Sequence, residues 1–224
     1  MEFESVDRGT PEGLERWRSA GSPPVPSVEI DGVATPILHA SQLAALLGIA
    51  APPSLESTRL GYDVLLVVES WAANLRALPW ELIVAPTPSR DRNVRNLTMN
   101  AIYPISLLPE TWATGVLDWG VVDLDEERGA AYTTTEQLAD YALGVYGQWA
   151  EFMLETEEAL ALANPEVETP RGRLRYSELL AAHRWHLSFH HRQIVEYLAL
   201  ERVEPAHPFR VEQLAGMTLP PAVF

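Results

Sequence analysis

The sequence contains no cysteine and no lysine, and both absences restrict the chemistry. All 16 basic residues are arginine. Without cysteine there is no thiolate nucleophile, no disulfide and no cysteine-ligated metal. Without lysine there is no Schiff-base chemistry. The side chains that remain as nucleophiles, metal ligands or proton carriers are those of His, Asp, Glu, Tyr, Ser and Thr.

Positive charge and long apolar runs are also scarce. The 224 residues carry a formal charge of −15, which argues against binding to nucleic acid phosphates. No apolar run reaches the roughly 18 residues of a membrane span, and no signal peptide is recognisable. We therefore expect a cytoplasmic protein with no nucleic-acid or membrane partner. The hydrophobic content of 47% supports a packed core.

The first 50 residues form a segment of their own, which residues 51–57 link to the rest through Pro52-Pro53. Asp31-Gly32 is a favourable hairpin turn and Gly48 a favourable helix end. The predicted order is β-α-β-β-α: a strand over 3–7, a helix over 11–20, strands over 25–30 and 35–38, and a helix over 40–47.

Residues 58–204 have the apolar spacing of long helices. We predict a mainly α fold, an up-down four-helix bundle with an extended connection between its second and third helices. The tail, 205–224, is expected to pack back on this bundle. The predicted helices cover about 58–78, 94–108, 134–163 and 177–199, joined by a long connection over 109–133 and a turn-rich link over 166–175.

The last of these helices holds four of the six histidines. His186 and His190 lie one turn apart, and His183 lies within roughly 60° of both on an arc shared with apolar residues. Two inward imidazoles at this spacing can bind one divalent ion. The alternative is a set of packed, hydrogen-bonded core histidines. His191 and Arg192 are further candidates for the lining of a pocket.

Other candidate site residues lie on the second helix and the long connection. Pro104 leaves the carbonyl of Asn100 without its helical donor, so a ligand, an ion or simply water can bind there. Trp112 and Trp119 either line a pocket mouth or cap the core. The acidic run 123–127 is interpreted as a solvated face.

Three segments resemble the DinB-like superfamily of metal-binding helical bundles: VRNLTMNAIYPISLLP, TPRGRLRYSELL and the final W-H-x-x-x-H-H-R-Q-I. The similarity covers about residues 57–202. It implies an enzyme that binds a divalent metal (Zn, Ni or Fe) through three histidines, one on the second helix and two in an HxxxH. His186 and His190 match the HxxxH. The second helix has no histidine, and Asn100 or Tyr103 stands near its expected place, with His183 as another source of a nitrogen. The superfamily includes transferases and isomerases that use a low-molecular-weight thiol, and the resemblance implies that the metal lowers the pKa of a bound thiol or water.

The segment 1–50 resembles the second half of a glutaredoxin or thioredoxin fold. The phrase VEIDG precedes a hairpin, and Val25-Pro26 is similar to that fold's cis-proline position. The first strand, the first helix and the CxxC are missing, so this remnant does not exchange disulfides.

Two functions therefore remain open. The first is a metal-dependent enzyme, a thiol-dependent transferase or hydrolase acting on a small molecule. The second is a non-catalytic binding or structural protein of the same fold, in which the histidines form a buried polar network. In this second case the N-terminal remnant is a docking surface, and a homodimer is expected.

Overall fold

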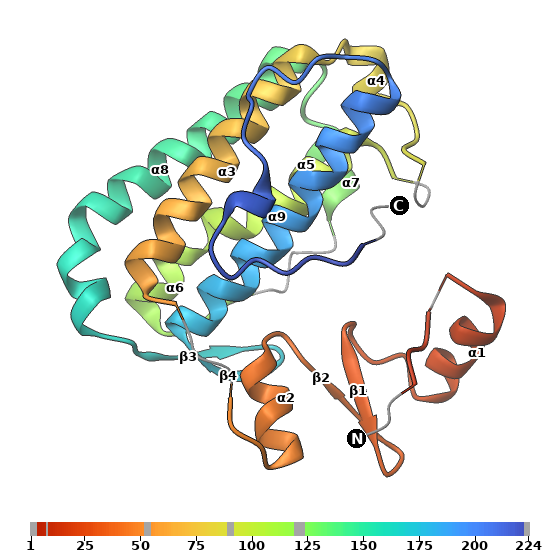
Figure 1. Cartoon of the computed structure of the whole chain (residues 1–224), viewed down its shortest axis with the longest axis vertical. Helices are drawn as coiled ribbons and strands as arrows, with labels where there is room; N and C mark the ends of the chain where they lie inside the picture. The colour runs from red at the N-terminus through yellow and green to blue at the C-terminus, as the bar shows by residue number, and fades with distance from the viewer. Residues whose placement is uncertain (1–3, 8, 52–54, 89–91, 119–123, 222–224) are drawn as a thin grey trace. The chain divides into compact units, whose positions relative to one another are not determined.

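The structure is a computed structural model that describes residues 4–7, 9–51, 55–88, 92–118 and 124–221 (Figure 1). The chain divides into two compact units, Met1–Pro53 and Ser54–Phe224, which are described separately. It is mainly α-helical, with two small β-hairpins. Among the described helices, none combines the length and hydropathy that a membrane span requires.

The first unit contains two short helices and one hairpin. The hairpin turns at Asp31-Gly32, where both residues have positive φ (51° and 79°) as a tight two-residue turn requires. The Val25-Pro26 peptide bond is cis. The side chain of Thr10 accepts from the Gly13 amide at the start of the first helix, and Gly48 ends the last in a left-handed conformation. The elements are α1 (Pro11–Ser19), β1 (Ser27–Ile30), β2 (Val33–Pro36) and α2 (Ala40–Leu47).

One predicted element of this unit is wrong in the described residues. Residues 4–7 are not a strand, while Phe3 lies outside the described residues. The carbonyl of Asp7 accepts from both the amide and the hydroxyl of Thr10, at 3.1 and 2.9 Å. This segment therefore forms the turn that leads into α1.

The second unit contains the four long helices predicted from the sequence. They are α3 (Ser57–Ala77), α5 (Val94–Ser106), α8 (Thr135–Leu162) and α9 (Tyr176–Leu200). The described residues of the segment over 109–133, which was predicted as a long connection, include one short helix and most of another. The shorter elements are α4 (Trp80–Val84), α6 (Leu108–Thr114), α7 (Asp125–Gly129), β3 (Glu166–Thr169), β4 (Gly172–Arg175) and the 3-10 turn η1 (Val211–Gln213).

Helix α3 packs against α8 and α9, and α5 packs against the same two helices (Figure 1). The contact between α3 and α8 is close because Gly61 has no side chain: a Cβ there would lie 2.3 Å from the Met153 sulfur. The indole of Trp149 donates to the carbonyl of Gly61 at 3.0 Å across this contact. Buried side chains such as Trp71 and Leu75 fill the space between the helices.

The link before α9, predicted to be rich in turns, is a β-hairpin. β3 and β4 pair antiparallel, and Glu168 of β3 also bridges to Val116. Beside it, the ring of Trp112 lies 4.9 Å from that of Tyr176 and 6.5 Å from that of Phe152. The hairpin is therefore anchored to the chain after α6. Trp119 lies outside the described residues.

The C-terminal tail runs back along α9, and side chains of α9 donate hydrogen bonds to backbone carbonyls of the tail. Arg184 donates to Ala215 at 2.8 Å, Trp185 donates to Thr218 at 2.9 Å, and Arg192 donates to Pro220. Arg184 also forms a buried ion pair with Asp63 of α3 at 2.7 Å. Through these contacts α9 holds the tail along its length.

Candidate functional site

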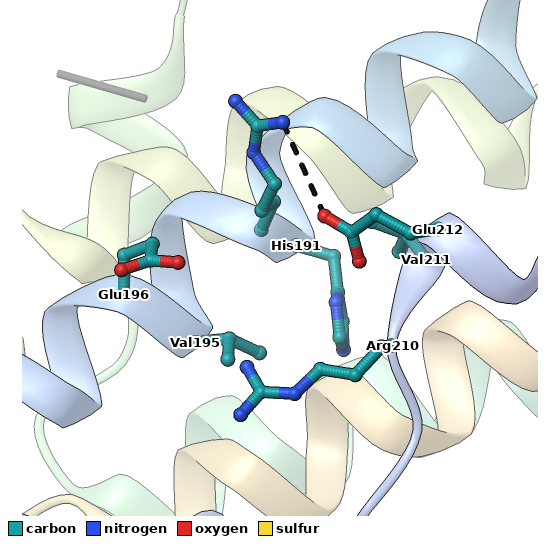
Figure 2. Close-up of a pocket in the computed structure, with 7 residues that line it drawn as sticks. His191, Val195, Glu196, Arg210, Val211 and Glu212 are labelled. Atoms are coloured by element: carbon teal, nitrogen blue, oxygen red, sulfur yellow. Dashed lines mark ion pairs between the residues drawn. The ribbon is translucent and has the colours of Figure 1, made fainter. Parts of the chain in front are cut away.

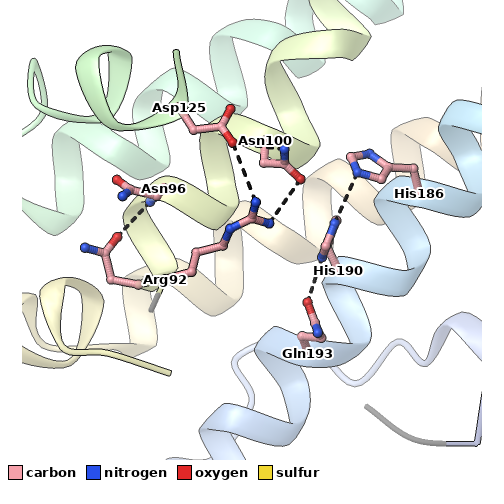
Figure 3. A network of polar contacts seen from close by, with 8 residues as sticks. Arg92, Asn96, Asn100, Asp125, His186, His190 and Gln193 are labelled. Atoms are coloured by element: carbon pink, nitrogen blue, oxygen red, sulfur yellow. Dashed lines mark hydrogen bonds and ion pairs between the residues drawn. The ribbon is translucent and has the colours of Figure 1, made fainter. Parts of the chain in front are cut away.

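The rings of His186 and His190 meet on one face of α9 (Figure 3). Their Nε2 atoms lie 3.1 Å apart, and the ring planes are 88° apart. His190 is 9% exposed and His186 is half-buried, so solvent reaches the pair at His186. The spacing of four residues brings the rings together because it is close to one helical turn.

Gln193 orients the His190 ring. Its Oε1 lies 2.6 Å from Nδ1 of His190 (Figure 3). An amide oxygen only accepts, so Nδ1 carries the proton and Nε2 presents a lone pair to His186. Metal-bound histidines are commonly held by such a contact on the ring nitrogen remote from the ion. Sequence reasoning overlooked Gln193, although its position three residues after His190 was a signal.

Burial favours the neutral form of two of these imidazoles, His186 and His183. Burial is the largest cause that lowers the pKa of His186 well below its ordinary value, and the charges of His190, His183, Arg92 and Arg171 add to it. Burial, with a smaller effect of Arg171, lowers the pKa of His183 to about 4. At neutral pH these rings have lone pairs available, and two guanidinium groups contribute positive potential around them.

Asn100 of α5 belongs to a polar network that faces the pair (Figure 3). Its amide oxygen accepts from Arg92 at 3.3 Å, and its amide nitrogen donates to Asp125 at 2.9 Å. The guanidinium of Arg92 and the carboxylate of Asp125 form an ion pair, with 3.9 Å between nitrogen and oxygen. The acidic run was interpreted as a solvated face, and for Asp125 that interpretation is wrong, because α7 packs its carboxylate against α5. Nothing in the local sequence indicated this contact.

The other predicted residues face different neighbours. The guanidinium of Arg128 in α7 lies 3.7 Å above the ring of Tyr103. His191 points into the core, where its Nε2 lies 2.9 Å from the hydroxyl of Ser70. Arg192 lies under the tail, 4.0 Å from Glu212.

Figure 2 shows His191 at a small cavity between α9 and the tail, and Arg192 also lines this cavity. Its volume of about 20 Å³ has room for one water molecule. This cavity therefore lies on the tail side of α9, whereas His186 and His190 face the polar network around Asn100 of α5.

The residues fit a metal ion in part. On one ion, two nitrogens each about 2.0–2.1 Å from it lie roughly 2.9–3.4 Å apart, and the 3.1 Å between His186 and His190 falls in this range. Within the described ranges, no group of three His, Cys, Asp or Glu residues is placed to hold an ion. The Asn100 oxygen already accepts from a guanidinium. The site therefore offers two convergent imidazoles.

No protein-family model, curated protein or solved structure matches the chain.

Proposed function

We propose that this protein is a metal-dependent enzyme of the DinB-like type, in which His186 and His190 bind a divalent ion such as Zn, Ni or Fe. In this proposal α3, α5, α8 and α9 form an up-down four-helix bundle, and the first unit derives from the second half of a thioredoxin-like fold. The observation that carries the proposal is the convergence of two imidazole Nε2 atoms, 3.1 Å apart, with Gln193 orienting one ring.

The substrate we propose is a small molecule, and the partner reactant is a low-molecular-weight thiol or water. When bound, the ion would lower the pKa of that thiol or water and so supply a nucleophile at neutral pH. The chain's own residues bind the ion and attract the anion. Arg92 and Arg171, whose charges act on His186, favour a thiolate or carboxylate beside the pair. Asn100 and Asp125 hold Arg92 in place.

Metal analysis tests this proposal. Purified protein loaded with Zn²⁺ or Co²⁺ and dialysed is expected to retain about one ion per chain, and the double variant His186→Ala/His190→Ala none. The control is His39→Asn, which removes a histidine from the first unit but keeps a residue that can cap α2. Gln193→Leu is expected to bind the ion on the order of 10–100 times more weakly. Equal, negligible metal in the wild type and the double variant would refute the metal site.

One observation favours a second candidate, a non-catalytic binding or structural protein. The two imidazoles can satisfy each other, because His186 can donate from Nε2 to the lone pair of His190. No third histidine or carboxylate joins them in the part of the chain that the structure describes. In this case the wild type and the double variant do not differ in bound metal, and the double variant has a lower melting temperature. Melting curves recorded beside the metal analysis separate the two candidates.

A further inference from the structure

The hairpin of the first unit has two outer edges, and they differ in the backbone hydrogen bonds that they can form with a further strand. Ile37 donates its amide to the carbonyl of Pro26 at 2.9 Å, so this pair of residues is hydrogen-bonded. In an antiparallel ladder hydrogen-bonded pairs alternate, which makes Val28–Thr35 and Ile30–Val33 the other bonded pairs in this register. The backbone groups of Ser27 and Glu29 in β1 therefore point outward, as do those of Ala34 and Pro36 in β2.

The outer edge of β1 is able to pair with another strand, and that of β2 is not. Pro36 has no N–H to donate, and proline on an edge blocks strand addition. On β1, Ser27 and Glu29 each present an N–H and a C=O. Among the described residues, no third strand pairs with either edge. A two-stranded hairpin is marginally stable alone, and this one leaves Ile30 and Val33 exposed.

We propose that two copies of this chain associate by antiparallel pairing of β1 with β1 of the second copy, forming a four-stranded sheet. A two-fold axis at Val28 makes the interface self-complementary. Ser27 and Glu29 of one copy then exchange four backbone hydrogen bonds with Glu29 and Ser27 of the other. The single charged side chain on β1, Glu29, lies opposite a serine, so like charges are diagonal, about 7–8 Å apart, and not directly opposite. The apolar faces that carry Val28 and Ile30 become continuous across the two copies.

The expected dimer is weak. A four-residue edge buries less than the roughly 1,200–2,000 Å² of a standard interface, so we expect dissociation in the micromolar range or weaker. This proposal does not depend on a metal, and it concerns only the first unit. Sedimentation of the full chain is expected to show a concentration-dependent monomer–dimer equilibrium. A chain that stays monomeric up to about 1 mM would overturn the proposal.

Proline substitution tests which edge pairs. Glu29→Pro removes an outward N–H without removing a bond between β1 and β2, and it acts twice in a symmetric dimer. We expect the dissociation constant to rise on the order of tenfold or more. The matched control Ala34→Pro removes an outward N–H from the other edge and should leave the dissociation constant unchanged. If Glu29→Pro dimerises like the wild type, the interface lies elsewhere and the proposal fails.

The cysteine-free chain allows a test of the register. In the proposed dimer, Val28 lies opposite Val28 of the second copy as a non-hydrogen-bonded pair. Their Cα atoms are then about 4.5 Å apart, which is within the range of a disulfide. Mild oxidation of Val28→Cys in the full chain is therefore expected to give a covalent dimer. Glu29→Cys places the two thiol-bearing residues diagonally, about 7–8 Å apart, and should cross-link much less. Equal cross-linking of the two variants, or none in Val28→Cys, would contradict the proposed pairing.

Discussion

At the scale of single residues, three of the four histidines of α9 divide into two groups according to their neighbours. His186 and His190 face the polar network on α5, and His191 faces α3, where it contacts Ser70 and lies 6.2 Å from the ring of Trp71. The HxxxH spacing predicted the first group. Gln193, which orients His190, lies one turn further along the same helix and could have been found from its spacing. Asp125 comes from α7 through tertiary packing, which periodicity does not encode.

The buried His191 predicts a pH dependence of stability. Burial lowers its pKa from 6.5 to about 3, with smaller effects of His207 and Arg210. Between pH 6.5 and 3 the unfolded chain therefore binds a proton that the folded chain does not, so stability falls as the pH falls through this window. The contribution is about 1.4 kcal/mol per pH unit below 6.5.

Urea unfolding of the wild type and of His191→Gln at pH 7 and pH 5.5 measures this contribution. Glutamine can still bond Ser70 but does not titrate. The variant is expected to be less stable at pH 7 and to lose about 1 kcal/mol less than the wild type on acidification. Parallel losses in the two proteins would show that His191 does not carry the effect.

At the scale of elements, the sequence predicted the long helices within a few residues. The apolar spacing of the sequence was enough for this. It did not predict the hairpin over 166–175, whose strands are four residues long and whose pairing with Val116 is a contact made only after folding. Short elements depend on such contacts more than on local preference.

The contact between α3 and α8 makes a prediction for Gly61. In Gly61→Ala the new methyl group meets the side chain of Met153, which must shift, so we expect the free energy of unfolding to fall by about 1–3 kcal/mol. Gly144→Ala on α8 is the control, because a Cβ there meets nothing within 4 Å. This control should gain about 0.5–1 kcal/mol from helix propensity. If Gly61→Ala also gains stability, the helices are less tightly packed than the structure shows.

At the scale of the whole molecule, the two compact units separate two properties. The histidine pair lies in Ser54–Phe224, and the hairpin edge lies in Met1–Pro53. We therefore expect a chain that begins at residue 54 to retain helical content and the affinity for a divalent ion while losing self-association. Circular dichroism, metal analysis and sedimentation of this fragment measure the three outcomes together. Loss of metal binding in a folded fragment would mean that the first unit contributes to the site.

The way α9 holds the tail has a consequence for variation. Arg184, Trp185 and Arg192 all bond main-chain oxygens, and every amino acid provides that atom. Replacing Ala215 or Thr218 by other small or polar residues therefore leaves these anchors intact, whereas losing one arginine from the helix removes an anchor outright. In related chains we therefore expect these helix residues to be conserved and the residues of the tail to vary.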